Sequence, residues 1–168
     1  MNDPVQSPHA RNFMKTHVEV VTPEMPLPEI IRFLLKHHVS NAPVVDIQNE
    51  KHILVGFISE KDCLSALSNE IFFGNPSPVQ CAKTIMTSHP ICIEPDTELF
   101  AIVSIFTSHN LRHLPVVQEG VLLGIISRRD ILEAMETYYK QLVNNSDHER
   151  LLRDTSQTMN LRFTLDRS

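Results

Sequence analysis

The feature that most constrains the fold is an internal repeat. Sliding the sequence by 72 residues aligns 13–46 with 85–118 without a gap, and nine of the 34 positions are identical. Reducing the shift to 68 aligns 55–67 with 123–135, where GFISEKDCL lies on GIISRRDIL. The difference places four extra residues in the polar segment 47–54, and surface turns tolerate such insertions. Two copies in a chain of 168 residues predict one internally pseudo-symmetric domain.

Each copy has the same expected order of secondary structure. A strand that ends at a proline comes first, then an amphipathic helix with apolar residues at helical spacing, then two strands and a closing helix. The expected strands are 17–23, 42–46 and 53–59 in the first copy and 89–95, 114–118 and 121–127 in the second. The expected helices are 26–38, 60–70, 97–110 and 128–139. The order is therefore β-α-β-β-α twice, and the fold class is α+β.

The composition disfavours several classes of protein. Fifteen Lys and Arg against twenty Asp and Glu give a net charge of −5, which argues against a nucleic-acid-binding protein. No apolar run is long enough for a membrane span, and the polar N-terminus lacks the apolar core of a secretory signal. Three cysteines without CxxC spacing indicate reduced thiols, so we expect a cytoplasmic protein. The sequence has no P-loop, nucleophile elbow or zinc-ligand pattern, so we expect neither an enzyme nor a metal site.

Both copies contain a Pro-Val-Val strand, at 43–45 and 115–117, and both close with Gly-x-x-Ser-x-x-Asp, at 56–62 and 124–130. These motifs, in this order, resemble those of the CBS-domain pair, or Bateman module. The resemblance covers most of the chain, and the same order of motifs in both copies makes it specific. On this basis we predict CBS repeat 1 at 12–70, a linker at 71–84, CBS repeat 2 at 85–139 and a C-terminal extension at 140–168.

The resemblance implies a regulatory role and not a catalytic one. Members of the family form a flat disk with a pseudo-two-fold axis and a cleft on either side. The clefts commonly bind adenosine-containing ligands such as AMP, ADP, ATP, S-adenosylmethionine or NAD. The resemblance further implies a homodimer, a separate effector protein as partner, and no required cofactor beyond this regulatory ligand. The alternative is a module with empty clefts that acts only through dimerisation and protein interaction.

The serine and aspartate of each closing motif are the first candidates for binding. The resemblance implies that Ser59 and Ser127 contact a phosphate and that Asp62 and Asp130 accept hydrogen bonds from ribose hydroxyls. Each motif lies where a strand runs into a helix N-terminus, which favours an anion. The same spacing is also a variant of the capping box, so these residues could simply cap their helices, and capping and ligand binding are compatible.

The charges around the two motifs differ between the copies. The second motif contains Arg128 and Arg129, and Arg112 and His113 precede its Pro-Val-Val strand. Because arginine pairs well with phosphate, we expect a phosphorylated ligand in the cleft of Ser127 and Asp130. The first motif contains Glu60, which would repel a phosphate, beside Lys61, a further candidate phosphate contact. The alternative for the two arginines is a solvated first helical turn.

The adenine pocket is expected near the first strand and the residue before each Pro-Val-Val. The candidates are Val20, Val21, Ala42, Ile91, Cys92, Ile93 and Leu114. Core packing explains each of them as well. In the tail, residues 146–152 resemble a short capped helix and residues 161–165 alternate like a strand.

Overall fold

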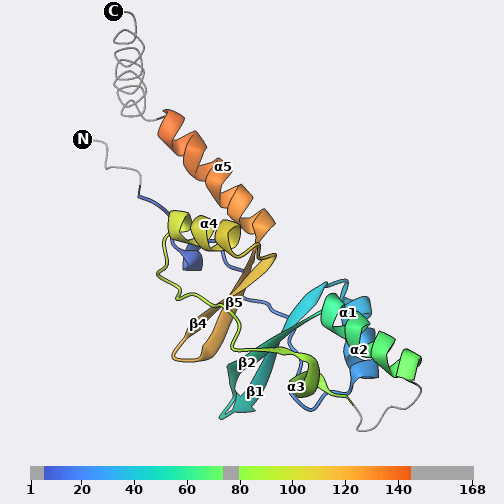
Figure 1. Ribbon diagram of the computed structural model, residues 1–168. Coiled ribbons are helices and arrows are strands. Elements are labelled where there is room, and N and C mark those ends of the chain that lie inside the picture. The colour runs from blue at the N-terminus through green and yellow to red at the C-terminus, as the bar shows by residue number, and fades with distance from the viewer. Residues whose placement is uncertain (1–5, 74–79, 145–168) are drawn as a thin grey trace, which may run out of the picture.

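The computed structural model describes residues 6–73 and 80–144 (Figure 1). Its mixture of helices and antiparallel strands confirms the α+β class. The elements of the first copy are α1 (Leu27–His37), β1 (Asn41–Gln48), β2 (Lys51–Ser59) and α2 (Glu60–Phe73). Those of the second copy are α4 (Leu99–Ser108), β4 (His113–Gln118), β5 (Val121–Ser127) and α5 (Arg128–Asn144). Three short elements, η1 (Ala10–Asn12), α3 (Ala82–Ile85) and β3 (Thr87–Ser88), precede the two helix-strand-strand-helix units.

The first strand expected in each copy is shorter than the sequence pattern indicates. Only Val21 pairs with β1 and only Ile93 pairs with β4, each as a single parallel bridge. The Val21 N–H donates to the Pro43 carbonyl at 3.0 Å, and the Val21 carbonyl accepts from Val45 at 2.9 Å. The prolines that end both expected strands have no N–H with which to continue a ladder, so pairing stops at one residue.

The four extra residues of the first copy lengthen its hairpin. The strands β1 and β2 have 8 and 9 residues, whereas β4 and β5 have 6 and 7. Both hairpins turn through two residues with positive φ, Asn49 and Glu50 in the first copy and Glu119 and Gly120 in the second. Positive φ at both central positions suits a two-residue hairpin turn. The insertion therefore leaves the turn and the sheet face unchanged, because it adds one pair of residues to each strand.

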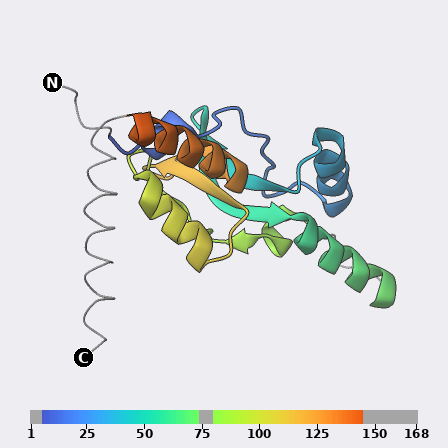
Figure 2. The ribbon, with the colours of Figure 1, turned by 90° about the horizontal axis from the view of Figure 1, so that it is seen from above.

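The two hairpins form one sheet with a helix pair at each end. The strand order is β1-β2-β5-β4, and β2 meets β5 where Ile53 lies opposite Val121. The helices α1 and α2 lie at one end of the molecule and α4 and α5 at the opposite end (Figures 1 and 2). Two separate cores result, each with buried residues of one helix pair and its hairpin. Burial of the apolar side chains in these cores is what stabilises the two halves.

Each core is completed by a segment from the other copy. We call residues 8–16 and 80–88 the head segments of the first and second copy. Ala10 is fully buried in the core of the second copy, and Ala82 is fully buried in the core of the first. Accordingly, η1 lies beside α4 and α5, while α3 lies near α1 and α2 (Figure 1). The exchange makes the two copies one structural unit, because neither core is complete without the other copy's head segment.

The backbone contacts of the two head segments are equivalent. In the first, the N–H of Ala10 donates to the Thr97 carbonyl at 2.8 Å, and that of Leu99 donates to the Pro8 carbonyl at 2.8 Å. In the second, the corresponding bonds are Ala82 to Met25 and Leu27 to Gln80, both at 2.9 Å. Every residue in one set lies 72 positions from its equivalent in the other. The repeat therefore extends upstream of the aligned range, into both head segments.

Paired methionines and glycines fix where each head segment crosses the sheet. Met86 lies over Gly56 of β2, and Met14 lies over Gly124 of β5. A Cβ on Gly124 would come within 2.7 Å of the Lys15 carbonyl oxygen, so a larger residue there would push the head segment away. Close approach of another backbone explains a glycine in the middle of a strand.

The boundaries expected for the repeats remain predictions. The range 71–84 includes the end of α2 and most of α3, and residues 140–144 form the end of α5. The helix and strand expected at 146–152 and 161–165 lie outside the described residues. Within the described part of the chain, no helix is both long enough and apolar enough to span a membrane.

Candidate functional site

The serine and aspartate of each closing motif form a reciprocal hydrogen-bonded unit at the start of a helix. At α5, the Ser127 N–H and hydroxyl donate to Asp130 Oδ2 at 2.7 and 2.5 Å, and the Asp130 N–H donates to Ser127 Oγ at 3.3 Å. At α2, Ser59 and Asp62 make the same three bonds, at 2.8, 2.6 and 3.4 Å. This geometry is that of a capping box. It also holds each carboxylate in one fixed orientation.

Asp130 is the buried charged residue of the described core. It is 6 % exposed, and the Lys15 ammonium lies 3.0 Å from its Oδ1. Burial alone raises the pKa of Asp130, but the two hydrogen bonds from Ser127 and the charge of Lys15 outweigh burial and hold the pKa below its ordinary value. The carboxylate is therefore ionised at neutral pH and available as an acceptor.

Asp130 and Ser127 lie in a cleft between the two copies. The cleft has a volume of about 280 Å³. The first copy contributes Lys15, His17, Val18, Glu19, His38, Val39, Ser40, Asn41 and Pro43, and the second contributes His113, Ile125, Ser127 and Asp130. The closing motif of the second copy thus faces the Pro-Val-Val region of the first copy. A ligand in this cleft would touch both halves of the molecule, which is the arrangement needed to couple binding to their relative position.

A hydrogen bond between equivalent residues joins the two copies at this cleft. The side-chain nitrogen of Asn41 lies 2.6 Å from His113 Nδ1, and the two residues are 72 positions apart. Since an amide nitrogen donates, His113 accepts at Nδ1 and carries its ring proton at Nε2. Burial lowers the pKa of His113, and this effect outweighs the nearby charge of Asp130, which raises it. The neutral form of His113 is therefore favoured.

The expected phosphate contacts divide into those in the cleft and those elsewhere. Of them, Ser127 and His113 line the cleft. The Arg128 guanidinium donates to the Leu111 and Asn110 carbonyls and to the Asn110 side chain, beside the end of α4. Arg129 pairs with Glu133 at 3.1 Å on the exposed face of α5. Arg112 and Lys61 are exposed and lie outside the residues that line this cleft. The roles predicted for these residues remain predictions.

The expected adenine contacts belong mainly to the two cores. Val21, Ala42 and Leu114 are fully buried, and Ile93 is 6 % exposed. Val20 is half-buried, while Ile91 and Cys92 are exposed. In the cleft of Asp130, their neighbours Val18, Asn41 and Pro43 line the wall. None of the seven candidates lines this cleft, and their role as adenine contacts remains a prediction.

Lys15 is one of the cleft residues that the sequence analysis did not identify, and it is the one that contacts Asp130. It comes from the head segment of the first copy and reaches the aspartate of the second copy. The equivalent residue in the repeat is Thr87, which lies on β3 beside Phe57 of β2. The sequence does show that lysine and threonine stand at equivalent positions of the two copies. This difference predicts a contact of Lys15 with Asp130 only when the exchange of head segments is known.

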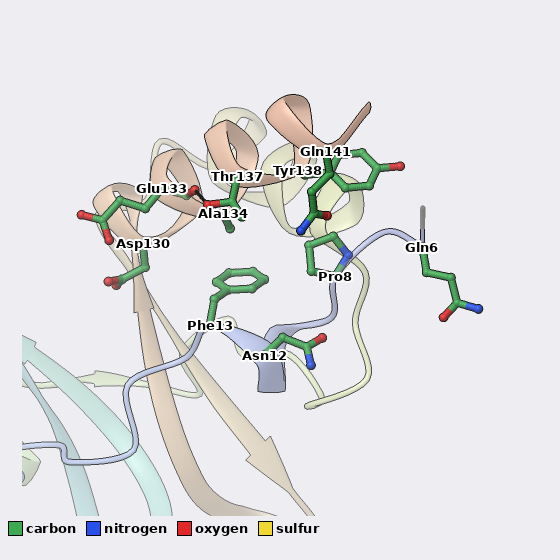
Figure 3. Close-up of a pocket in the computed structure, with 10 residues that line it drawn as sticks. All are labelled: Gln6, Pro8, Asn12, Phe13, Asp130, Glu133, Ala134, Thr137, Tyr138 and Gln141. Atoms are coloured by element: carbon green, nitrogen blue, oxygen red, sulfur yellow. Dashed lines mark hydrogen bonds between the residues drawn. The ribbon is translucent and has the colours of Figure 1, made fainter. Parts of the chain in front are cut away.

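A second hollow shares Asp130 with the cleft. It has a volume of about 340 Å³ and lies between residues 6–13 and α5 (Figure 3). The ring of Phe13 occupies its middle, with Asp130 at one end and Tyr138 and Gln141 toward the other (Figure 3). Among the described residues, no group of three or more His, Cys, Asp or Glu side chains is placed to hold a metal ion.

Comparison with known proteins identifies the family. The family model of the CBS domain matches the chain twice, over residues 10–69 and 82–137. An uncharacterised 17.7 kDa protein of Acidianus ambivalens is 33 % identical over 121 residues, which are 71 % of this chain and 68 % of that protein. The crystal structure of CBSX2, an Arabidopsis thaliana CBS-pair protein, in complex with AMP has a TM-score of 0.67 and 26 % identity, covering 77 % of this chain and 96 % of CBSX2.

A second solved structure supports the same fold. The CBS-domain pair of protein MJ0100, solved with 5′-methylthioadenosine and S-adenosylmethionine, has a TM-score of 0.63 at 21 % identity and covers 79 % of this chain and 98 % of that chain. At this identity the likeness concerns the fold alone. Because the two family matches span more than half of the sequence in tandem, the chain belongs to the CBS-domain family and folds as a CBS pair.

Proposed function

We propose that the chain is a regulatory module that binds an adenosine-containing nucleotide and passes the signal to a separate effector protein. The observation that carries the proposal is the buried carboxylate of Asp130, which Ser127 orients at a cleft lined by both copies. A carboxylate with two acceptor oxygens suits the two hydroxyls of a ribose. The AMP complex of CBSX2 supports the ligand class. A ligand between two halves can change their relation, which supports a regulatory role.

Calorimetric titration of the purified chain tests this proposal. The ligands are AMP, ADP, ATP, S-adenosylmethionine, NAD and NADH. We expect at least one to bind, and Asp130→Ala to abolish the binding at the Asp130 cleft while the protein stays folded. Asp62→Ala is the matched control, because it removes the same capping bonds at the other helix and leaves the Asp130 cleft unchanged. Loss of a helix cap costs about 0.5–2 kcal/mol in either variant, so equal destabilisation with unequal ligand binding separates the two roles.

Two results would contradict the proposal. If no ligand in the series binds, the clefts do not serve nucleotides. If a ligand binds equally well to wild type, Asp130→Ala and Asp62→Ala, its site lies elsewhere. Circular dichroism of each variant confirms that the fold is intact before either conclusion is drawn.

Exposed apolar helix faces favour a second role as an interaction module, with self-association into a homodimer. Between α1 and α2 lies a groove of about 350 Å³ whose lining is mainly aliphatic. On its rim, Leu35 is 66 % exposed and Leu64 is 67 % exposed. Exposed apolar patches of this kind commonly mark protein interfaces. Sedimentation should give a dimer for wild type and a monomer for Leu64→Glu, with Ser65→Glu, on the same exposed helix, as the control that leaves the mass unchanged.

A further inference from the structure

The head segment of the first copy carries a lysine to the buried carboxylate of the second copy. The Lys15 backbone exchanges two hydrogen bonds with Ile125, at 3.0 and 2.9 Å. The root of its side chain is therefore fixed beside the strand that leads to Ser127. The Lys15 ammonium lies 3.0 Å from Asp130 Oδ1, and its side chain is 62 % exposed whereas that of Asp130 is 6 % exposed. Since Lys15 lines the cleft, it covers the carboxylate on the side that a ligand would approach.

The hydrogen bonds of Asp130 leave little room for a ribose. Its Oδ2 already accepts the N–H and the hydroxyl of Ser127. Its Oδ1 holds the Lys15 ammonium. A carboxylate offers about four acceptor positions, so three of them are occupied. Two ribose hydroxyls that bind this carboxylate must therefore take the position of the ammonium.

The equivalent carboxylate of the first copy has a different neighbour. Ser59 holds Asp62 Oδ2 as Ser127 holds that of Asp130. The position of Lys15, shifted by 72, is taken by Thr87, which pairs with β2 as Lys15 pairs with β5. Within the described ranges, no cationic side chain forms an ion pair with Asp62. The capping bonds of the two motifs are alike, but Asp130 has a lysine ammonium on its carboxylate and Asp62 has none in the described part of the chain.

Glu19, the other carboxylate at the Asp130 cleft, and His113 have partners of their own. Glu19 lies 3.1 Å from His37 Nδ1 and 3.8 Å from His17 Nε2. His113 accepts from Asn41. The Lys15 ammonium is thus the cation that this structure places directly on the carboxylate.

We propose that Lys15 makes the Asp130 cleft selective for phosphorylated nucleosides over neutral ones. This inference rests on the proposed function, because it concerns the ligand of the same cleft. A neutral nucleoside that binds Asp130 displaces the ammonium and gives it no new partner. A nucleotide displaces it too, but its phosphate pairs with the released ammonium, which sits on a flexible four-carbon stem. At Asp62, where the equivalent position is held by the uncharged Thr87, we expect no such preference.

Calorimetric titration with AMP and with adenosine tests the selectivity. The variants are made in an Asp62→Asn background, so that only the Asp130 cleft is measured. We expect Lys15→Ala to weaken AMP binding by about tenfold or more, as loss of a charge-assisted hydrogen bond does. Adenosine binding should be unchanged or tighter. Lys15→Arg, which keeps the charge, should preserve the preference for AMP. Thr87→Ala, at the equivalent position of the other copy, should change neither affinity.

The possible failures are distinguishable. If the parent binds adenosine as tightly as AMP, the selectivity does not exist, while the proposed function stands. If Lys15→Ala weakens both ligands equally or neither, the lysine does not recognise phosphate, and the inference is wrong. If the parent and the wild type bind neither AMP nor adenosine and no other adenosine ligand, the proposed function fails and this inference fails with it.

Discussion

The closest contacts between the head segments and the sheet predict how two glycines respond to alanine. A Cβ on Gly124 would lie 2.7 Å from the Lys15 carbonyl oxygen and 3.0 Å from Met14 Sδ. A Cβ on Gly56 would overlap Met86 Sδ and lie 2.9 Å from Met86 Cγ. The nearest atoms at Gly56 all belong to the methionine side chain, whereas at Gly124 one of them is backbone. Neither glycine has a positive φ, so alanine fits the backbone conformation and the effect is steric.

The stability cost of each alanine depends on whether the atoms that its Cβ would meet can move away. Where space allows, Gly→Ala stabilises by about 0.4–1 kcal/mol, because the unfolded chain has fewer conformations. Overpacking of a filled site costs about 1–3 kcal/mol. The Met86 side chain is flexible and can turn away. The Lys15 carbonyl accepts from Ile125 at 2.9 Å and can move only if that bond is lost. We expect Gly124→Ala to lower the free energy of unfolding by about 2–3 kcal/mol and Gly56→Ala by about 1 kcal/mol.

Urea unfolding of single and double variants measures both effects. The free energies are comparable when the m-values agree. In a Met86→Ala background, Gly56→Ala should no longer be destabilising, because the overlapping atoms are gone. In a Met14→Ala background, Gly124→Ala should keep most of its cost, since the backbone contact remains. Wild-type stability of Gly124→Ala would refute the reasoning, and so would complete rescue by Met14→Ala.

Three further predictions follow from individual side chains. The pKa of Asp130 is lower in the folded protein than in the unfolded chain. Its contribution to stability is therefore complete above the unfolded value of about 3.9 and is lost as the pH falls through the folded value. In urea unfolding between about pH 5 and pH 2, wild type should lose more stability than Asp130→Asn. The pKa of His113 is also lowered, so NMR titration should give a value below about 6.5, and His113→Gln should lose less stability than wild type as the pH falls from neutrality past that value. Arg128→Ala removes bonds to two carbonyls and should cost about 1 kcal/mol, whereas Arg129→Ala breaks an exposed pair and should cost about 0–0.5 kcal/mol; equal costs in urea unfolding would contradict this difference.

Local patterns in the sequence were sufficient to predict most of the elements. The expected strand 121–127 is identical to β5, and the expected helices 26–38 and 97–110 differ from α1 and α4 by one or two residues at each end. These elements depend on apolar periodicity and on their own turns, which are local properties. The predictions of the first strands, 17–23 and 89–95, were wrong because these strands depend on contacts with strands that are distant in sequence. Val21 and Ile93 alone pair with them. The alternation of apolar and polar residues within one segment does not show how many of its residues pair with a strand that is distant in sequence.

The candidate site shows the same division between local and distant contacts. Ser127 and Asp130 are three residues apart, so their hydrogen bonds could be expected from spacing alone. Arg128 and Arg129 lie between Ser127 and Asp130 in the sequence, and their positive charge led to the prediction that they contact a phosphate. Their side chains instead bind the end of α4 and Glu133. Residue type and proximity indicate what a side chain can bind, but its direction depends on which partner lies closest after folding.

The sequence repeat does not show whether each head segment packs on its own copy or on the other copy. The identities of Met14 with Met86 and of Gly56 with Gly124 require only that each head segment crosses one of the two hairpins. Folding back onto its own copy and crossing to the other copy satisfy the same identities, because the copies are equivalent. The differences between copies are what distinguish the two cases. Lys15 meets Asp130 only if the segments are exchanged, whereas without exchange it would occupy the place of Thr87 beside Phe57 of β2, the strand that leads to Asp62. The charge at each carboxylate is therefore a consequence of how the two copies are connected in space.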